Sequence, residues 1–289
     1  GDKVVLQSPV YPPFFKSIEN NGRRVLDNKL RYTGEGYEMD LELLESQIDE
    51  ETKMIALCSP HNPVGRVWSR EELQGLAEIV LKHDLLVFSD EIHADLVYSG
   101  ADHTSFASLS RELAERTITG IAPSKTFNIA GLKASVIITP RENLRREFDK
   151  AQERTFGLYN ANTFAICAAE AAYREGEAWL EALMEYLEAN RDYALQRLER
   201  ELPEIQVAKP EGTFLLWLDC NRFRLSPEEL YETVSCRGRV GLNDGRSFGA
   251  GGEGFLRLNI GCPRSVLTEG LDRLTGVLGP LREGAAVRR

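Results

Sequence analysis

Cysteine and histidine are scarce in this sequence, and neither occurs in pairs. Its 289 residues include five cysteines and four histidines. The cysteines are Cys58, Cys167, Cys220, Cys236 and Cys262, and no two of them form a C-x-x-C pair. Disulfide frameworks and zinc sites need paired or closely spaced ligands. The sequence therefore predicts no disulfide and no metal site, and it favours a reducing compartment, the cytoplasm.

Long apolar runs and an excess of positive charge are also lacking. The longest apolar stretches, such as 85–88 and 215–218, fall far short of the roughly 20 residues of a membrane helix. The first residues, GDKVVLQ, lack the basic and apolar parts of a signal peptide. Asp and Glu outnumber Lys and Arg by 45 to 35, giving a net charge of -10, which repels phosphate backbones and anionic lipid surfaces. We expect neither a membrane nor a nucleic-acid partner.

The residues that are present are typical of a globular protein with a large core, since 42% are hydrophobic and 28% charged. In the first two thirds of the chain, strands are predicted at 53–60, 85–91, 117–124 and 134–140. Between the first two, Ser69 and Glu72 form a capping box ahead of an apolar stripe over 73–80, and a polar helix is predicted at about 109–116. This alternation predicts an α/β fold with a mostly parallel sheet flanked by helices.

The pattern changes at about residue 176, where a charged, periodic helix of more than five turns begins. It is followed by strands at 213–220 and 255–262, a helix that begins with Ser226, Pro227 and Glu229, and a C-terminal helix from about Ser265. We predict a large domain at 1–175, then an interdomain helix and a smaller α+β domain at 176–289.

Polar residues follow three predicted strands at the point where each strand ends. Asn62 lies after the first strand, Asp90 ends the second, and Ser124 and Lys125 end the third. Ligands of open parallel sheets bind beyond the carboxyl ends of the strands. A lysine there is costly to bury as an ammonium ion, and an imine removes that cost. Pyridoxal phosphate chemistry needs a Schiff-base lysine, a carboxylate opposite the pyridine nitrogen, and donors for the ring oxygen and the phosphate, all of which these four residues supply.

Five motifs occur in the order of a known family: P-x-Y at 9–11, N-P-x-G at 62–65, D-E-I-H at 90–93, S-K-T-F-N-I-A-G-L-K at 124–133 and R-L-N at 257–259. The chain resembles, over essentially its whole length, the fold-type I pyridoxal phosphate enzymes of the class I/II aminotransferase superfamily. The strings HNPVGRVW, SDEIHADLVY and APSKTFNIAGLK are most similar to the carbon-sulfur lyase branch, the cystathionine β-lyases of the MalY/PatB type. The resemblance implies the PLP-dependent transferase-like fold and a homodimer.

The resemblance also implies roles for particular residues. Lys125 forms the imine with the cofactor and later moves the Cα proton of the substrate. Asp90 pairs with the pyridinium nitrogen, and Asn62 donates a hydrogen bond to the phenolic oxygen of the ring. Arg257 holds the carboxylate of a small, sulfur-containing amino-acid substrate, for which a planar guanidinium is well suited. The implied activity is a β-lyase that cleaves cystathionine or a related cysteine S-conjugate to a thiol, pyruvate and ammonia.

Four further cofactor contacts follow from the same resemblance. Tyr11 stacks on the ring, while Ser124 and Lys133 bind the phosphate. His93 contacts the cofactor at a position where many relatives have tyrosine, and Lys133 stands where many have arginine. The family also has an N-terminal region ahead of the segment with Tyr11, so the sequence is similar to a member that lacks it.

Other interpretations stay open from the residues alone. Lys125 could be a lysine whose stem packs at a strand end, Asp90 a helix cap, and Asn62 a turn residue. His93 could be structural, and Arg257 could pair with an acidic residue of the protein. An aminotransferase shares the same site, and a non-catalytic ligand sensor could share the same fold.

Two further patterns are given no role in the chemistry. The glycines at 249, 251 and 254 spell G-x-G-x-x-G, but this run precedes a strand rather than a helix, so we predict a mobile loop instead of a dinucleotide site. We predict that His61, His83 and His103 lie on the surface.

Overall fold

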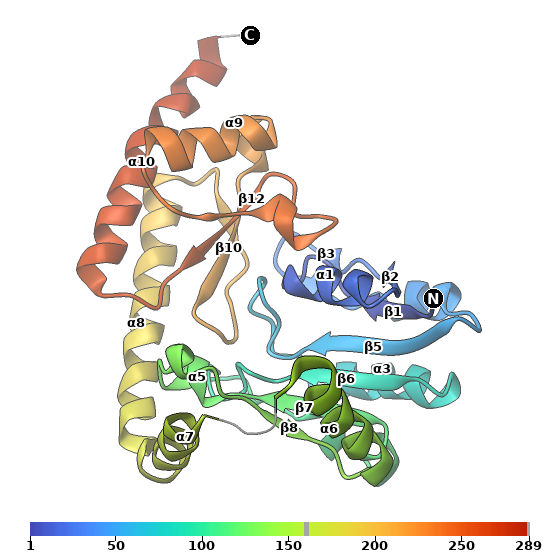
Figure 1. Cartoon of the computed structure of the whole chain (residues 1–289). Coiled ribbons are helices and arrows are strands. Elements are labelled where there is room, and N and C mark those ends of the chain that lie inside the picture. The colour runs from blue at the N-terminus through green and yellow to red at the C-terminus, as the bar shows by residue number, and fades with distance from the viewer. Residues whose placement is uncertain (159–161, 288–289) are drawn as a thin grey trace.

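The computed structural model describes residues 1–158 and 162–287, with side chains as far as residue 281. Two sheets dominate it (Figure 1). The larger has six strands in the order β2-β1-β5-β6-β7-β8, parallel except for the pairing of β7 with β8. Its strands are β1 (Lys3–Leu6), β2 (Arg24–Asp27), β5 (Thr52–Cys58), β6 (Leu86–Asp90), β7 (Thr117–Ile121) and β8 (Val136–Ile138).

The strands place apolar side chains on both faces of this sheet. Both faces are therefore covered by helices. In β5, Ile55 and Leu57 pack in the core that contains the apolar face of α3 (Arg70–Lys82), whereas Ala56 and Cys58 pack with residues of α1 (Pro13–Asn20). The capping box of Ser69 and Glu72 forms as predicted at the start of α3. The α/β fold with a mostly parallel sheet is therefore confirmed.

The remaining helices and a hairpin complete the first two thirds of the chain. The predicted polar helix is a single turn, and the strand predicted at 134–140 is reduced to the three residues of β8. The hairpin consists of β3 (Arg31–Tyr32) and β4 (Tyr37–Glu38). The remaining helices are α2 (Leu41–Gln47), α4 (Arg111–Ala114), α5 (Pro123–Thr126), α6 (Glu142–Phe156) and α7 (Thr163–Glu175).

The C-terminal third contains a four-stranded antiparallel sheet, in the order β11-β12-β10-β9. Helix α8 (Glu177–Glu201) runs past both sheets in Figure 1, as the long charged helix predicted from residue 176. The other elements are β9 (Gln206–Val207), β10 (Leu215–Asp219), α9 (Pro227–Glu232), β11 (Asn243–Asp244), β12 (Phe255–Asn259) and α10 (Arg264–Val287).

Successive side chains of β12 point to opposite faces of its sheet, so only every second one faces the larger sheet. Leu256 and Leu258 join a core formed with α8 and α10, whereas Phe255 joins the core of the first two thirds. Arg257 shares the side of Phe255 and so points toward the large sheet. Trp217 of β10 donates a hydrogen bond of 3.0 Å from Nε1 to the hydroxyl of Tyr37, which joins the two parts of the chain.

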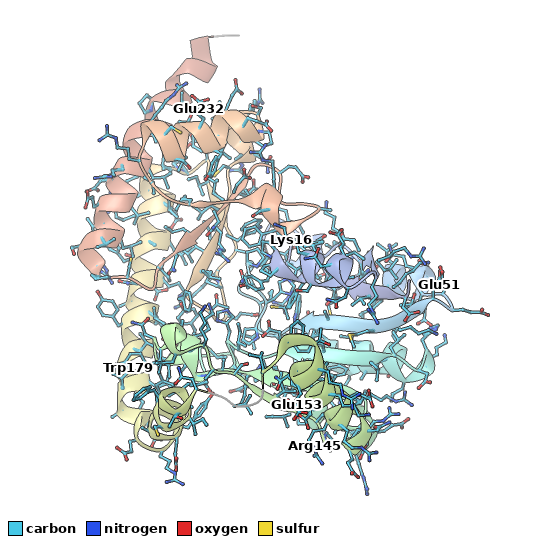
Figure 2. All side chains as sticks on the ribbon, viewed as in Figure 1. Lys16, Glu51, Arg145, Glu153, Trp179 and Glu232 are labelled. Carbon is cyan, nitrogen blue, oxygen red and sulfur yellow. The ribbon has the colours of Figure 1, made fainter. Side chains whose placement is uncertain are left out.

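The proposed division into domains at residues 175 and 176 coincides with the junction of α7 and α8, and it stays a prediction. Residues 159–161 and 288–289 of the predicted domains lie outside the described part of the chain. Charged side chains such as Glu51, Arg145 and Glu232 project outward (Figure 2). Within the described residues, no helix combines the length and the apolar character that crossing a membrane requires.

Candidate functional site

The carboxyl ends of β5, β6 and β7 lie together, and the predicted polar residues follow them. Cys58 at the end of β5 pairs in register with Asp90 at the end of β6, and Asp90 pairs with Gly120 of β7. A cavity of about 210 Å³, here called the catalytic cavity, lies beyond this edge. It brings together six of the predicted site residues: Tyr11, Asn62, Asp90, His93, Lys125 and Arg257.

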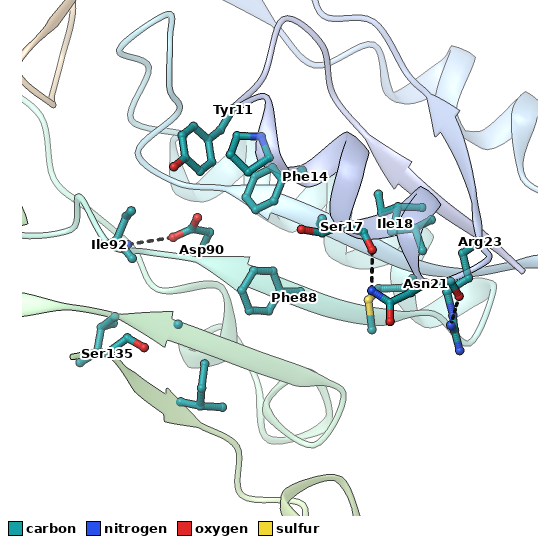
Figure 3. Close-up of a pocket in the computed structure, with 17 residues that line it drawn as sticks. Tyr11, Phe14, Ser17, Ile18, Asn21, Arg23, Phe88, Asp90, Ile92 and Ser135 are labelled. Atoms are coloured by element: carbon teal, nitrogen blue, oxygen red, sulfur yellow. Dashed lines mark hydrogen bonds between the residues drawn. The ribbon is translucent and has the colours of Figure 1, made fainter. Parts of the chain in front are cut away.

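Asp90 lies at the floor of the catalytic cavity and is only 8% exposed. Burial raises the pKa of its carboxyl group to about 6, with the nearby Glu91 carboxylate contributing in the same direction. The backbone N–H of Ile92 and the ammonium of Lys125 oppose this pKa shift, and the hydrogen bond from Ile92 to Oδ1 is a long 3.3 Å (Figure 3). A cationic N–H placed opposite Asp90 would favour the ionised carboxylate.

Arg257 faces Asp90 from the second sheet and carries a charge that no carboxylate contact neutralises within the described residues. Its Nη1 and Nη2 donate hydrogen bonds of 2.8 Å to the Oδ1 atoms of Asn62 and Asn243, which are neutral amides. Its Nε is buried and has no hydrogen-bond partner among the described residues. Burial lowers the pKa of the guanidinium. The cavity therefore offers an anion a partly buried cation whose described hydrogen-bond partners are neutral.

His93 is 3% exposed, and its Nδ1 has no partner within the described part of the chain. Burial, together with the charges of Lys125 and Arg257, lowers the pKa of the imidazole to about 3. The ring packs edge-on against Phe214, with centroids 5.5 Å apart. A neutral histidine with an orphaned ring nitrogen can serve a ligand as hydrogen-bond donor or acceptor.

Lys125 differs in position from the prediction. Strand β7 ends at Ile121, so the lysine lies in the single-turn helix α5, and its side chain is partly rather than fully buried. The structure keeps Ser124 out of the catalytic cavity, but Ser124 lines a neighbouring cavity that shares Lys125. Lys133 is exposed, with a left-handed backbone (φ 53°), and lines neither cavity. Its predicted phosphate contact stays a prediction.

A third cavity, of about 700 Å³, opens between α1 and the sheet. It shares Tyr11, Asp90 and Ile92 with the catalytic cavity. In Figure 3, Tyr11 and Phe14 lie across from the end of the strand that carries Asp90, and their rings meet edge to face at 5.8 Å. Asp90 is thus reached from two cavities, which leaves room for a planar ring beside it.

Several residues at the site were missed from the sequence. Cys58, Phe214 and Asn259 also line the catalytic cavity. Asn259 belongs to the R-L-N motif and Cys58 ends a predicted strand. These two positions could have indicated that both residues lie at the site. Phe214 carried no such signal.

Glu91, also missed, lies behind Asp90 and is 3% exposed. Its carboxylate accepts hydrogen bonds from Ser89 Oγ (2.7 Å), Ser105 Oγ (3.1 Å) and Phe106 N (3.2 Å) and contacts His103 Nε2 at 3.1 Å. These contacts fasten the 103–106 segment to the end of β6. Glu91 therefore supports the position of Asp90.

The histidines predicted on the surface lie deeper than expected. His61 is fully buried, so its prediction was wrong, because Nε2 lies 2.9 Å from the carbonyl oxygen of Pro9 and the ring packs on Trp68. The side chains of His83 and His103 are 27% and 13% exposed, and each contacts a glutamate, Glu45 and Glu91 respectively.

The chain belongs to the aminotransferase class I and II family, whose model matches residues 1–274. It is 46% identical over 279 residues to cystathionine beta-lyase PatB of Bacillus subtilis (strain 168), covering 96% of this chain and 72% of that protein. It is 34% identical over 283 residues to protein MalY of Escherichia coli (strain K12), covering 98% and 72%. The structure of cystalysin from Treponema denticola, which contains a pyridoxal 5'-phosphate cofactor, matches with a TM-score of 0.95 and 39% identity, covering 97% of this chain and 71% of that one. The predicted family and its carbon-sulfur lyase branch are confirmed.

Proposed function

We propose that this protein is a pyridoxal phosphate-dependent carbon-sulfur β-lyase that cleaves cystathionine or a related cysteine S-conjugate. The observation that carries the proposal is the convergence of Lys125, Asp90, Asn62 and Arg257 on one cavity. The names of the relatives support the same activity, since PatB is a cystathionine beta-lyase. The substrate is then a small, sulfur-containing amino acid.

The residues present fit the cofactor at its ring. The buried Asp90 carboxylate suits a protonated pyridine nitrogen, and the Lys125 amine suits the imine linkage. Asn62 would donate a hydrogen bond to the ring oxygen, and Tyr11 would stack on the ring. His93, whose Nδ1 has no partner among the described residues, lines the same cavity. Ser124 and Lys133 are the proposed phosphate contacts. When bound, the cofactor supplies a sink for the electron pair left at Cα.

The protein's own residues perform the remaining steps. Arg257 binds the substrate carboxylate and fixes the Cα–H bond toward Lys125, whose Nζ removes the proton. The Cβ–S bond then breaks, and its electron pair leaves with the sulfur, which takes up a proton to become the thiol. The remaining three-carbon unit reacts with one water to give pyruvate and ammonia, so one substrate and one water yield three products.

The test combines an absorbance spectrum with product analysis. With pyridoxal phosphate added, wild type should show a visible absorbance band that Lys125→Ala lacks, and L-cystathionine should give pyruvate without a keto-acid acceptor. Lys16→Ala on α1 is the matched control, since this exposed lysine lies outside the site (Figure 2). If the band is present but amino transfer to an added keto acid replaces pyruvate formation, the protein is an aminotransferase. If the band is present with neither pyruvate formation nor amino transfer, the protein is a ligand sensor. Absence of the band from wild type would refute cofactor binding by this chain.

We also propose a homodimer located in the cytoplasm. Large apolar side chains near the α6–α7 junction are exposed: Phe156 by 66%, Leu158 by 58% and Phe164 by 78%. Such side chains are typical of interfaces, and closed two-fold dimers are the commonest oligomers. Light scattering should give twice the chain mass for wild type and a smaller mass for Phe164→Asp. The five cysteines, all free thiols, are in keeping with a reducing compartment.

A further inference from the structure

Arg257 contacts a segment that has no part in the steps above, here called the 243–248 segment. It consists of β11 and the 3-10 turn that follows it. Asn243 of β11 pairs in register with Arg257 of β12, the strand that lies beside β10 in Figure 1. Residues directly opposite one another in antiparallel strands carry their side chains on the same face. Asn243 and Arg257 therefore both face the larger sheet.

The 243–248 segment holds the guanidinium of Arg257 at two points. Asn243 Oδ1 accepts a hydrogen bond of 2.8 Å from Nη2, while Asn62 Oδ1 accepts one of the same length from Nη1. The ring of Phe248 lies with its centroid 4.9 Å from the guanidinium carbon Cζ, in the geometry of a cation–π contact. These contacts hold a flexible side chain in one orientation, which a fork for a substrate carboxylate requires.

The 243–248 segment is itself firmly attached to its surroundings. Phe248 is 1% exposed, and its backbone carbonyl accepts a hydrogen bond of 2.9 Å from Val10 N. Gly245 lies so close to β12 that a Cβ atom there would be 2.5 Å from the carbonyl oxygen of Phe255. These contacts within the protein fix the position of Asn243.

The absence of charge at Asn243 matters as much as its position. A carboxylate there would form an ion pair with Arg257 and repel the carboxylate of a substrate, whereas an amide accepts a hydrogen bond without bringing a charge. The neighbouring acidic residue, Asp244, pairs instead with Arg246. Successive residues of a strand point to opposite faces, so Asp244 points away from Arg257. The charge of Arg257 is thus kept for an anionic ligand.

We propose that Asn243 is a positioning residue of the carboxylate site: it orients Arg257 and, because it is neutral, keeps the guanidinium available to the substrate. This inference rests on the proposed lyase function and adds a residue to its substrate-binding site. An acid of the same shape at position 243 should then be more harmful than loss of the hydrogen bond. A merely structural role would favour the acid, because a carboxylate accepts the stronger hydrogen bond.

The first experiment measures KM and kcat for pyruvate formation from L-cystathionine. Asn243→Ala should raise KM about threefold, since Arg257 keeps its charge but loses one acceptor. Asn243→Asp should raise KM about tenfold, because it neutralises the guanidinium and places a like charge near the substrate carboxylate. In both variants kcat should stay within about twofold of the wild-type value, since the reacting groups are unchanged.

Asn143→Asp is the matched control for the charge change. Asn143 is also exposed, and its Oδ1 accepts a hydrogen bond of 2.8 Å from Arg141 Nε, but it lies on α6 and does not line the catalytic cavity. The control makes the same chemical change beside another arginine, so KM and kcat should equal the wild-type values. Circular dichroism should be the same for wild type and all three variants, because both asparagines are exposed.

A second measurement separates this inference from the lyase proposal. Propanoate has a carboxylate but no amino group, so calorimetry can measure its binding to the cofactor-loaded protein without turnover. Its dissociation constant should rise about threefold in Asn243→Ala and about tenfold in Asn243→Asp. If no substrate gives pyruvate but these changes in propanoate binding occur, the lyase proposal fails and the role of Asn243 stands.

Three results would overturn the inference. The first is a KM of Asn243→Asp equal to or below that of wild type. The second is a KM of Asn243→Ala at least as high as that of Asn243→Asp, since the charge at position 243 would then be irrelevant. The third is propanoate binding that Arg257→Lys weakens and Asn243→Asp does not, which would leave Arg257 as the carboxylate site without a role for Asn243.

Discussion

Replacing Asp90 with asparagine should stabilise the cofactor-free protein at neutral and alkaline pH while removing its proposed function. Burial raises the pKa of this carboxyl to about 6, about two pH units above the value of about 3.9 in an unfolded chain. At about 1.36 kcal/mol per unit, ionising Asp90 costs the folded state about 3 kcal/mol. The asparagine side chain has the same shape, carries no charge, and can still accept the hydrogen bond from Ile92.

The sign of the pH dependence follows from proton binding. Between about pH 4 and 6 the folded protein holds a proton at Asp90 that the unfolded chain has lost, so wild-type stability falls as pH rises through this window. Above it, the loss is complete. The difference in unfolding free energy between Asp90→Asn and wild type should therefore grow by about 3 kcal/mol in favour of the variant from about pH 4 to about pH 8.

Urea unfolding of both proteins without cofactor, at about pH 4, 6 and 8, measures this difference directly. Because all other groups titrate alike in the two proteins, only Asp90 contributes to the change. Asp102→Asn, which removes an exposed carboxylate outside the site, is the control for these titrations. A stability difference that stays constant across the three pH values would refute the reasoning. Pyridoxal phosphate should stabilise wild type more than the variant, since only wild type offers the ring nitrogen a carboxylate.

Three further substitutions test other parts of the structure. Arg257→Lys should raise KM about tenfold or more with a smaller change in kcat, because a lysine cannot hold Asn62 and a substrate carboxylate in one fork; steady-state pyruvate assays check this, and an unchanged KM would exclude carboxylate binding here. Glu91→Ala should lower the unfolding free energy by about 3 kcal/mol, because buried donors lose their charged acceptor, whereas Glu91→Gln should lose less; equal losses in urea titrations would contradict the hydrogen-bond argument. Ser69→Ala should cost about 1 kcal/mol in the same titrations by removing the cap of α3, and a cost near zero would show that the cap contributes nothing.

The parts of the site that follow strands in the larger sheet were accessible from the sequence. The apolar runs ending at Cys58 and Asp90 predicted buried strands, and parallel neighbours bring their carboxyl ends to one edge. The sequence alone therefore predicts that Asp90 and Asn62 lie close together. The exact position of Lys125 could not, because Pro123 and Ser124 form a helical turn that the apolar pattern extended as a strand.

Contacts between distant segments were beyond local patterns. Arg257 reaches Asn62 across 195 residues of sequence, and only the family resemblance linked them. His61 was predicted on the surface because polarity alone places it there, yet the carbonyl of Pro9 and the ring of Trp68 enclose it. The cavity between α5 and α8 likewise depends on how one face of a long helix meets α5, which no helical periodicity specifies.

The electrostatics of the catalytic cavity connect these observations to ligand binding. Burial moves the pKa of Asp90 upward and those of His93 and Arg257 downward, so each group is held under conditions that disfavour its charge. A structural ion pair would relieve this by joining Asp90 to Arg257, but the guanidinium instead hydrogen-bonds amides. Opposite charges kept apart in one cavity are suited to a ligand pair that brings a cation to the carboxylate and a carboxylate to the guanidinium. Burying Asp90 and Arg257 without opposite charges costs the folded protein free energy, and such ligands would recover part of it. Both the cofactor and the amino acid should therefore bind more tightly than the area of their contacts with the protein predicts.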